Sequence, residues 1–255
     1  MKALFSLIAM AFFFMSTVTA QTEAATKKDS INYTDENGNK QGYWVIEKQR
    51  IKSHGYFVDG KKEGSWVTYF PSEIPQLIET YKDGKLDGVV IELDRKGYLI
   101  AETYYRNGEL NGKKRAFERG SRVVLEETYK NGKLDGLKKT FYANGKNQEE
   151  SYYVNGVKSG LSTWYNQSGK VIAEYTYKNG QFDGVQKTFY PDGSLQTEET
   201  YKDNIRDGEY REFFQDGKVK ISGHYKNGLK DGVWTEFDET GKVISEKKYK
   251  KGVEK

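Results

Sequence analysis

The sequence predicts an all-β fold: an elongated array of antiparallel β-hairpins that lie side by side in one open meander sheet. Three observations predict it. Two glycines recur at a spacing of 24 residues along most of the chain. Asn-Gly or Asp-Gly pairs, which favour tight hairpin turns, supply many of the first glycines. Between the turns, apolar and polar residues alternate as they do in half-buried strands.

Residues 1–20 predict a secretory signal peptide, which accounts for the only helix expected in the chain. Lys2 supplies the positive end, residues 3–15 are apolar, and small residues at 18–20 precede an expected cleavage before Gln21. The apolar stretch is shorter than the roughly 20 residues of a membrane span, and an uncleaved anchor helix is the alternative. We therefore expect export to the periplasm or the cell exterior. Because the chain has no cysteine, neither disulfides nor a lipid anchor on cysteine are expected.

Residues 21–37 are expected to form a short linker. The segment DENGNKQG at 35–42 begins like a calcium-binding loop. Such a loop needs glycine where Lys40 stands and glutamate where Ile46 stands, so we interpret the segment as a turn and expect no metal site.

Residues 38–255 are expected to form about nine hairpin repeats. The second glycine of each unit recurs without exception at Gly64, Gly88, Gly112, Gly136, Gly160, Gly184, Gly208 and Gly232. The first glycine runs from Gly60 to Gly252 in the same steps, except that Asn204 replaces one. Asparagine is among the few residues that tolerate positive φ, so this exception predicts a left-handed turn position.

Each 24-residue unit is expected to contain two strands and two tight turns. An aromatic ring stands three residues before each first glycine, as at Tyr81 and Tyr129, and a second ring column includes Phe141 and Phe189. A lone hairpin is marginal in water, whereas stacked hairpins bury the rings between neighbours. The equal repeat length keeps the strands in register, because a slip of one residue moves every ring to the other face.

Overall composition argues against an electrostatic partner. Charged residues make up 31% of the chain, but 41 basic residues offset 37 acidic ones, for a net charge of +4. Such balance predicts no strong attraction to nucleic acid or to anionic lipid.

The repeat core resembles MORN repeats, in the bacterial variant that also occurs in antitoxin-like proteins of the YwqK type. The matching pattern is Tyr-x-Asn/Asp-Gly-x-x-Asp-Gly at 81–88, 129–136 and 225–232, and Gly-x-Trp follows at 42–44, 64–66 and 232–234. The resemblance covers about residues 38–252 and implies an open β-hairpin solenoid that serves protein association, sometimes near membranes. It implies no enzymatic activity. An antitoxin role fits poorly with the expected export.

No catalytic constellation is evident, so we expect a protein that is not an enzyme and takes no cofactor. The two histidines, His54 and His224, stand about seven repeats apart and cannot act together. No glycine pair is followed by the Lys-Ser/Thr ending of a phosphate loop.

Two sets of side chains are candidates for binding. Large rings near the second glycine are either exposed anchors for a partner or packing groups that close over the sheet; they are Trp66, Trp164, Tyr210 and Trp234. An acidic column is either a solvated row with lysines from neighbouring strands or a track for a basic partner; the candidates are Glu126, Glu150, Glu174 and Glu198.

The first hypothesis for function is an exported scaffold that binds a protein partner. An antitoxin or immunity-like protein is a second, and a binder of envelope glycan or lipid is a third. End-to-end self-association through the outer strands is also expected to be possible, because an edge strand has unpaired backbone groups.

Overall fold

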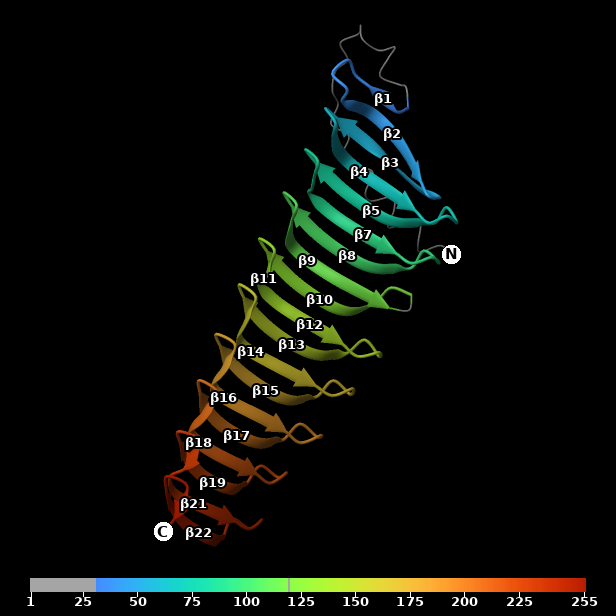
Figure 1. Cartoon of the computed structure of the whole chain (residues 1–255). Helices are drawn as coiled ribbons and strands as arrows, with labels where there is room; N and C mark the ends of the chain where they lie inside the picture. Colours follow the sequence, from blue (N-terminus) through green and yellow to red (C-terminus); the bar gives the residue numbers. More distant parts are fainter. Residues whose placement is uncertain (1–30, 119) are drawn as a thin grey trace, which may run out of the picture.

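A computed structural model describes residues 31–118 and 120–255. It holds 23 strands in one sheet, and the described residues form no helix. Figure 1 shows the strands following one another down a long, twisted ribbon, with turns along both of its edges. The predicted all-β hairpin array is confirmed for these residues, whereas the predicted signal helix at 1–20 lies outside them.

The long strands cross the full width of the ribbon. They are β2 (Lys40–Lys48), β3 (Ile51–Val58), β4 (Lys61–Tyr69), β5 (Pro75–Lys82), β7 (Gly88–Leu93), β8 (Leu99–Arg106), β9 (Glu109–Glu118), β10 (Arg122–Lys130), β12 (Gly136–Phe141), β13 (Asn147–Val154), β14 (Val157–Tyr165), β15 (Val171–Lys178), β16 (Gln181–Phe189), β17 (Leu195–Lys202), β18 (Ile205–Phe213), β19 (Val219–Lys226), β21 (Gly232–Phe237) and β22 (Val243–Lys250). Short pieces complete the sheet: β1 (Tyr33–Thr34), β6 (Lys85–Leu86), β11 (Lys133–Leu134), β20 (Leu229–Lys230) and β23 (Val253–Glu254).

The sheet is a simple meander, in which each long strand pairs antiparallel with the next one along the chain. Lys139 of β12 faces Glu150 of β13, for example, and Glu150 in turn faces Thr163 of β14. Facing residues of this kind share one side of the sheet. Rows of side chains therefore run across the strands along the whole length of the array.

The first turn of each repeat has left-handed backbone at both central residues. Asn131 and Gly132 have φ values of 49° and 75°, which suits the Asn-Gly pair that the sequence places there. Asn204, the exception in the glycine column, has φ of 67°. The predicted left-handed position is confirmed.

The second turn of each repeat is a longer loop, except in the first hairpin. Between β12 and β13, the N–H of Gly145 donates to the carbonyl of Tyr142 at 2.8 Å, and the register shifts beside Phe141. The β2–β3 hairpin instead turns through Gln49 and Arg50 alone, and its pairing continues without a shift to the turn.

At the start of the described chain, β1 lies inside the segment expected to be a linker and pairs with the beginning of β2. In the segment 35–42, residues 35–39 form a turn and residues 40–42 begin β2. The Asp35 carboxylate accepts the N–H groups of Asn37 and Asn39 at 2.9 and 2.8 Å. Backbone donors satisfy this carboxylate, as they do in Asx turns.

Candidate binding faces

The two faces of the sheet differ in their side chains. We call one the tyrosine face, because it carries the ring column Phe57, Tyr81, Tyr105, Tyr129, Tyr153, Tyr177, Tyr201, Tyr225 and Tyr249. We call the other the charge face. Its central row runs through Glu102, Arg115, Glu126, Lys139, Glu150, Thr163, Glu174, Lys187, Glu198 and Arg211.

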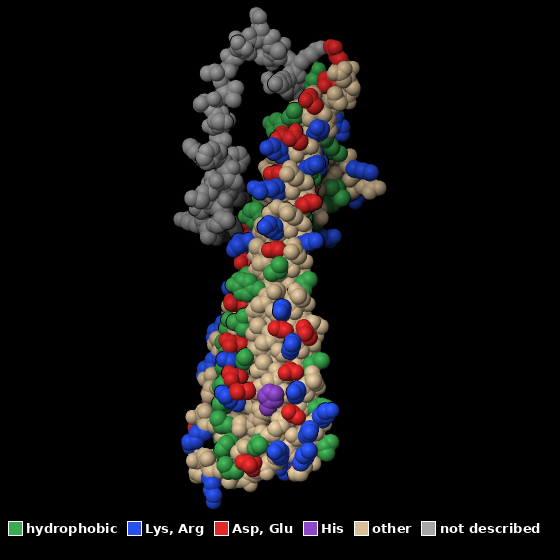
Figure 2. Space-filling model, turned by 90° about the vertical axis from the view of Figure 1, so that its left-hand side faces the viewer, with side chains coloured by type: hydrophobic (Ala, Val, Ile, Leu, Met, Phe, Trp, Pro, Cys, Tyr) green, Lys and Arg blue, Asp and Glu red, His purple; other side chains and the backbone are tan. Residues whose placement is uncertain are grey.

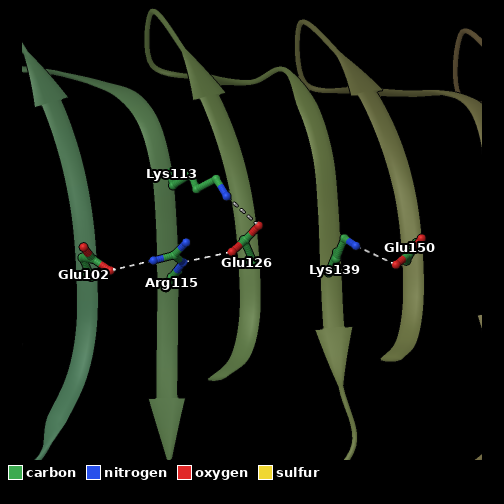
Figure 3. A network of polar contacts seen from close by, with 6 residues as sticks. All are labelled: Glu102, Lys113, Arg115, Glu126, Lys139 and Glu150. Atoms are coloured by element: carbon green, nitrogen blue, oxygen red, sulfur yellow. Dashed lines mark hydrogen bonds and ion pairs between the residues drawn. The ribbon is translucent and has the colours of Figure 1, made fainter. Parts of the chain in front are cut away.

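The central row of the charge face alternates in sign from strand to strand, except where the neutral Thr163 lies between Glu150 and Glu174. Figure 3 shows Arg115 between Glu102 and Glu126, each from a different strand. Arg115 Nε donates to Glu126 Oε2 at 2.9 Å, and its Nη1 donates to Glu102 Oε2 at 3.2 Å. Farther along, Lys139 Nζ lies 2.7 Å from Glu150 Oε1. Cross-strand pairs of opposite charge stabilise a sheet by about 0.2–1 kcal/mol each.

The contacts with Arg115 and Lys113 lower the pKa of Glu126. Burial raises the pKa of its carboxyl, but hydrogen bonds from Arg115 and Lys113 outweigh the burial and leave the pKa lowered. Lys113 Nζ reaches the second carboxylate oxygen at 3.2 Å. Glu126 is therefore an anion with both oxygens occupied at neutral pH.

The predicted acidic column lies entirely in this row, but most of it is not a free acidic track. Glu126 and Glu150 have the partners described above, and Lys187 lies 3.5 Å from Glu198. For Glu174 the described residues supply no ion pair, although Lys187 faces it across the strands. The structure thus matches the interpretation with basic partners from neighbouring strands for Glu126, Glu150 and Glu198.

On the tyrosine face, two of the candidate rings match the packing alternative rather than that of exposed anchors. Trp66 is 1% exposed and Trp234 is 7% exposed. Each ring covers a glycine on the preceding strand, Gly55 or Gly223, where any Cβ atom would collide with the indole. The indole N–H of Trp66 donates to the carbonyl of Tyr56 at 3.0 Å. These rings close over the sheet, which is the packing alternative.

The other two candidate rings are half-buried on the same face. Tyr210 stacks on Trp234, with ring centroids 5.4 Å apart and an angle of 28° between the planes. Burial and then the charge of Glu212 raise the pKa of Tyr210 to about 12. Trp164 faces Ala173 across the strands. Its indole nitrogen is buried and has no hydrogen-bond partner among the described residues.

Cations lie over the rings of the tyrosine face. Lys62 Nζ is 4.5 Å from the ring centroids of both Trp66 and Tyr81. Lys230 Nζ repeats the arrangement 4.1 Å from Trp234. Such cation–π contacts cover the ring faces that an external partner would need.

The sequence reasoning missed an exposed apolar row on the charge face, beside the central row. We call it the exposed apolar row, and its members are 38–55% exposed: Tyr56, Tyr104, Tyr152, Leu161, Val185 and Val233. The row is interrupted, because some strands between its members carry polar residues at this position, such as Lys113 and Thr128 between Tyr104 and Tyr152. Its members stand two residues from the central row along each strand, on the side of the first turn. Leu137, for example, faces Tyr152, just as Lys139 faces Glu150. Strand alternation places Val185 on the same side as Phe189, so the signal was present in the sequence.

Other kinds of site find no support in the described part of the chain. Residues 31–118 and 120–255 hold no group of three or more His, Asp or Glu side chains placed to bind a metal ion. None of the described segments is a helix that could cross a membrane. Figure 2 shows acidic and basic side chains interspersed along the array, with no large block of one sign on the side in view.

Comparison with known proteins identifies the repeat. Five consecutive segments match the family model described as MORN repeat variant: residues 134–155, 158–179, 182–203, 206–227 and 230–251. The comparison with curated proteins finds no match. The matched segments start 24 residues apart, in step with the glycine columns.

Proposed function

The chain is a MORN-repeat protein, with tandem repeats at 134–251, and we propose that it is an exported scaffold without enzymatic activity that binds a protein partner. MORN repeats often serve as interaction modules for proteins or membranes. Fold alone does not define a partner, so the proposal depends on the surface of this chain.

The exposed apolar row is the observation that carries the proposal. It places tyrosine and aliphatic side chains on one face of a continuous sheet. Tyrosine is enriched in protein interfaces, where its ring supplies contact area with little loss of conformational freedom. Next to the row, Arg115, Glu126 and Lys139 have partners within the chain. A partner therefore meets apolar groups beside charges that are already compensated.

The test is crosslinking in cells with a tagged chain, followed by mass spectrometry. The variant Tyr104→Ser/Tyr152→Ser removes two rings from the exposed apolar row. We expect it to weaken capture of the partner by at least about tenfold, because tyrosine is enriched among the interface residues whose truncation costs more than about 1 kcal/mol, and about 1.4 kcal/mol is a factor of ten.

The matched control is Tyr98→Ser/Ile244→Ser. These side chains are 50% and 58% exposed but lie near the second turns, outside the row. Recovery of the same partner by the control and not by the row variant supports the proposal. Equal recovery by wild type and both variants contradicts it.

Export is tested separately, by fractionating cells and sequencing the N terminus of the isolated chain. The composition of residues 1–20 supports a processed form that begins at Gln21. A chain that keeps residue 1 and remains with the cytoplasmic fraction refutes this part of the proposal.

A further inference from the structure

A cavity of about 750 Å³ opens on the charge face at the N-terminal end of the array. It lies where the first hairpin departs from the repeat. The tight turn at Gln49 and Arg50 lets β2 and β3 pair as far as Lys48 and Ile51. The next hairpin turns earlier, through the loop 70–74, and the cavity lies between that loop and the tip of the first hairpin.

Aromatic rings from three neighbouring strands form the floor. His54 of β3 stacks on Tyr69 of β4, with ring centroids 5.4 Å apart and planes 30° apart. Tyr43 of β2 lies 5.4 Å from the same imidazole. His54 Nε2 and the Tyr69 hydroxyl are 2.9 Å apart and share a hydrogen bond. The floor thus combines three rings packed against one another with one fixed polar pair.

In other repeats, the His54 position holds isoleucine, glutamate or serine, as at Ile78, Glu102 and Ser222. Burial and then the charge of Lys52 lower the pKa of His54, so the imidazole is neutral at pH 7. A neutral imidazole can both donate and accept hydrogen bonds.

Five charged side chains line the rim: Glu47, Lys48, Arg50, Lys52 and Glu73. No ion pair involves any of them within the described residues, in contrast to Arg115 and Lys139 at the centre of the array. Three basic groups against two acidic ones leave an excess of one positive charge at the opening.

We infer that this cavity binds an acidic sugar, a short saccharide that carries a carboxylate on its ring. The C–H groups of a sugar ring pack against aromatic side chains, and three such side chains line the floor. Its hydroxyl groups can bond to His54, Tyr69 and the rim carboxylates. The carboxylate pairs with the guanidinium of Arg50, which recognises carboxylates with two parallel hydrogen bonds. The volume falls within the roughly 300–1,000 Å³ of small-molecule sites.

This inference is independent of the proposed protein partner, because no residue of the exposed apolar row lines the cavity. The probe is trigalacturonic acid, titrated calorimetrically into the full chain as isolated. Maltotriose, which is neutral, and inorganic phosphate, which is charged but has no sugar ring, are the comparison ligands. We expect the acidic trisaccharide to bind at least about tenfold more tightly than either, because it engages both the rings and the rim.

Two variants identify the site. Arg50→Asn removes the guanidinium but keeps a residue that tolerates the φ of 66° at this turn. We expect it to weaken binding about tenfold. Tyr69→Phe removes the hydroxyl that bonds to His54 and is expected to weaken binding about threefold, as for loss of one neutral hydrogen bond.

The matched control is Tyr165→Phe, which makes the same change at the same repeat position, four periods later. It should leave affinity unchanged. Equal binding of maltotriose, equal binding of phosphate, or no measurable binding of trigalacturonic acid overturns the inference. Equal loss of affinity in Tyr69→Phe and Tyr165→Phe also overturns it, because the ligand then does not select the cavity.

Discussion

The hairpins near the N-terminal end and those at the centre of the array share one backbone but fill it differently. On the tyrosine face, Gly55 and Trp66 occupy the positions that Ser151 and Ser162 occupy four periods later. Trp66 is 1% exposed over its glycine, and both serines are fully buried. The repeat therefore sets backbone and register, whereas the volumes of side chains are matched between neighbouring strands, pair by pair.

The charge face shows the same contrast. Near the N-terminal end its central row holds Val67, Ile78 and Ile91, which face one another across the strands. Two periods after Val67, the same column holds Arg115 between two glutamates. Within each stretch of the row, facing residues match one another: apolar side chains face apolar ones, and acidic side chains face basic ones. A substitution should thus be judged against its cross-strand neighbours rather than against the consensus of the repeat.

The largest expected effect comes from breaking the glycine–tryptophan pair. A Cβ atom at Gly55 lies 2.5 Å from the Trp66 ring, so Gly55→Ser should destabilise the chain by about 2–3 kcal/mol through overpacking. Trp66→Ser should destabilise it by about 3–5 kcal/mol through lost burial. The double variant reproduces the Ser151–Ser162 pair and should be no less stable than Trp66→Ser alone.

Chemical denaturation of the four chains measures this coupling as a double-mutant cycle. Gly223→Ser, which faces Trp234, serves as the second example of the pair and should show a loss of similar size. Strictly additive losses at Gly55 and Trp66 would falsify the idea that the two residues are matched.

A smaller effect is expected in the charge row. Arg115→Gln leaves Glu102 and Glu126 without their shared cation and should destabilise the chain by about 1 kcal/mol. Lys187→Gln is the matched control, since Lys187 has one carboxylate partner at 3.5 Å and should matter less. Thermal unfolding at low and high salt measures both, and the Arg115 effect should shrink in high salt.

The Arg115–Glu126 pair also predicts that stability depends on pH. The pKa of Glu126 is lowered in the folded chain, so its contribution is present above the ordinary glutamate pKa of about 4.3. It is lost as pH falls through the lower folded value. The stability difference between wild type and Arg115→Gln should thus hold from pH 7 to about 5 and shrink below about 4. A difference that persists undiminished at pH 2 contradicts an electrostatic origin.

Much of the fold could be predicted from the sequence because a strict period reports backbone geometry directly. Asn204 identified a left-handed position, and Asn131-Gly132 identified the turn that joins β10 to β11. The burial of Trp66 was not settled, because a one-residue uncertainty in the turn changes which side chains share a face. The missing signal was Gly55, a glycine outside both repeat columns, eleven residues before the tryptophan.

The cavity could not be predicted for a related reason. It depends on the two-residue turn at Gln49 and Arg50, with φ values of 50° and 66°. Neither residue is glycine or asparagine, so the sequence carries no hairpin signal there. The stacking of His54 on Tyr69 then follows from the pairing of β3 with β4, which only the register reveals.

The smallest expected effect separates two contributions of Asn204 to stability: its tolerance of left-handed backbone and its side-chain hydrogen bond. Asn204 takes the place of a glycine, but its Oδ1 also accepts the N–H of Phe182 at 2.7 Å. Asn204→Gly relieves the left-handed strain and loses this hydrogen bond, so we expect a net destabilisation of about 0.5 kcal/mol. Asn204→Ala loses the bond and keeps the strain, so it should destabilise by about 1–2 kcal/mol.

The control is Gly132→Asn, where an added Cβ meets nothing within 4 Å, and it should be nearly neutral. Denaturation midpoints rank the variants. If Asn204→Ala is as stable as wild type, the repeat column does not demand left-handed backbone, and its glycines must be explained by packing instead.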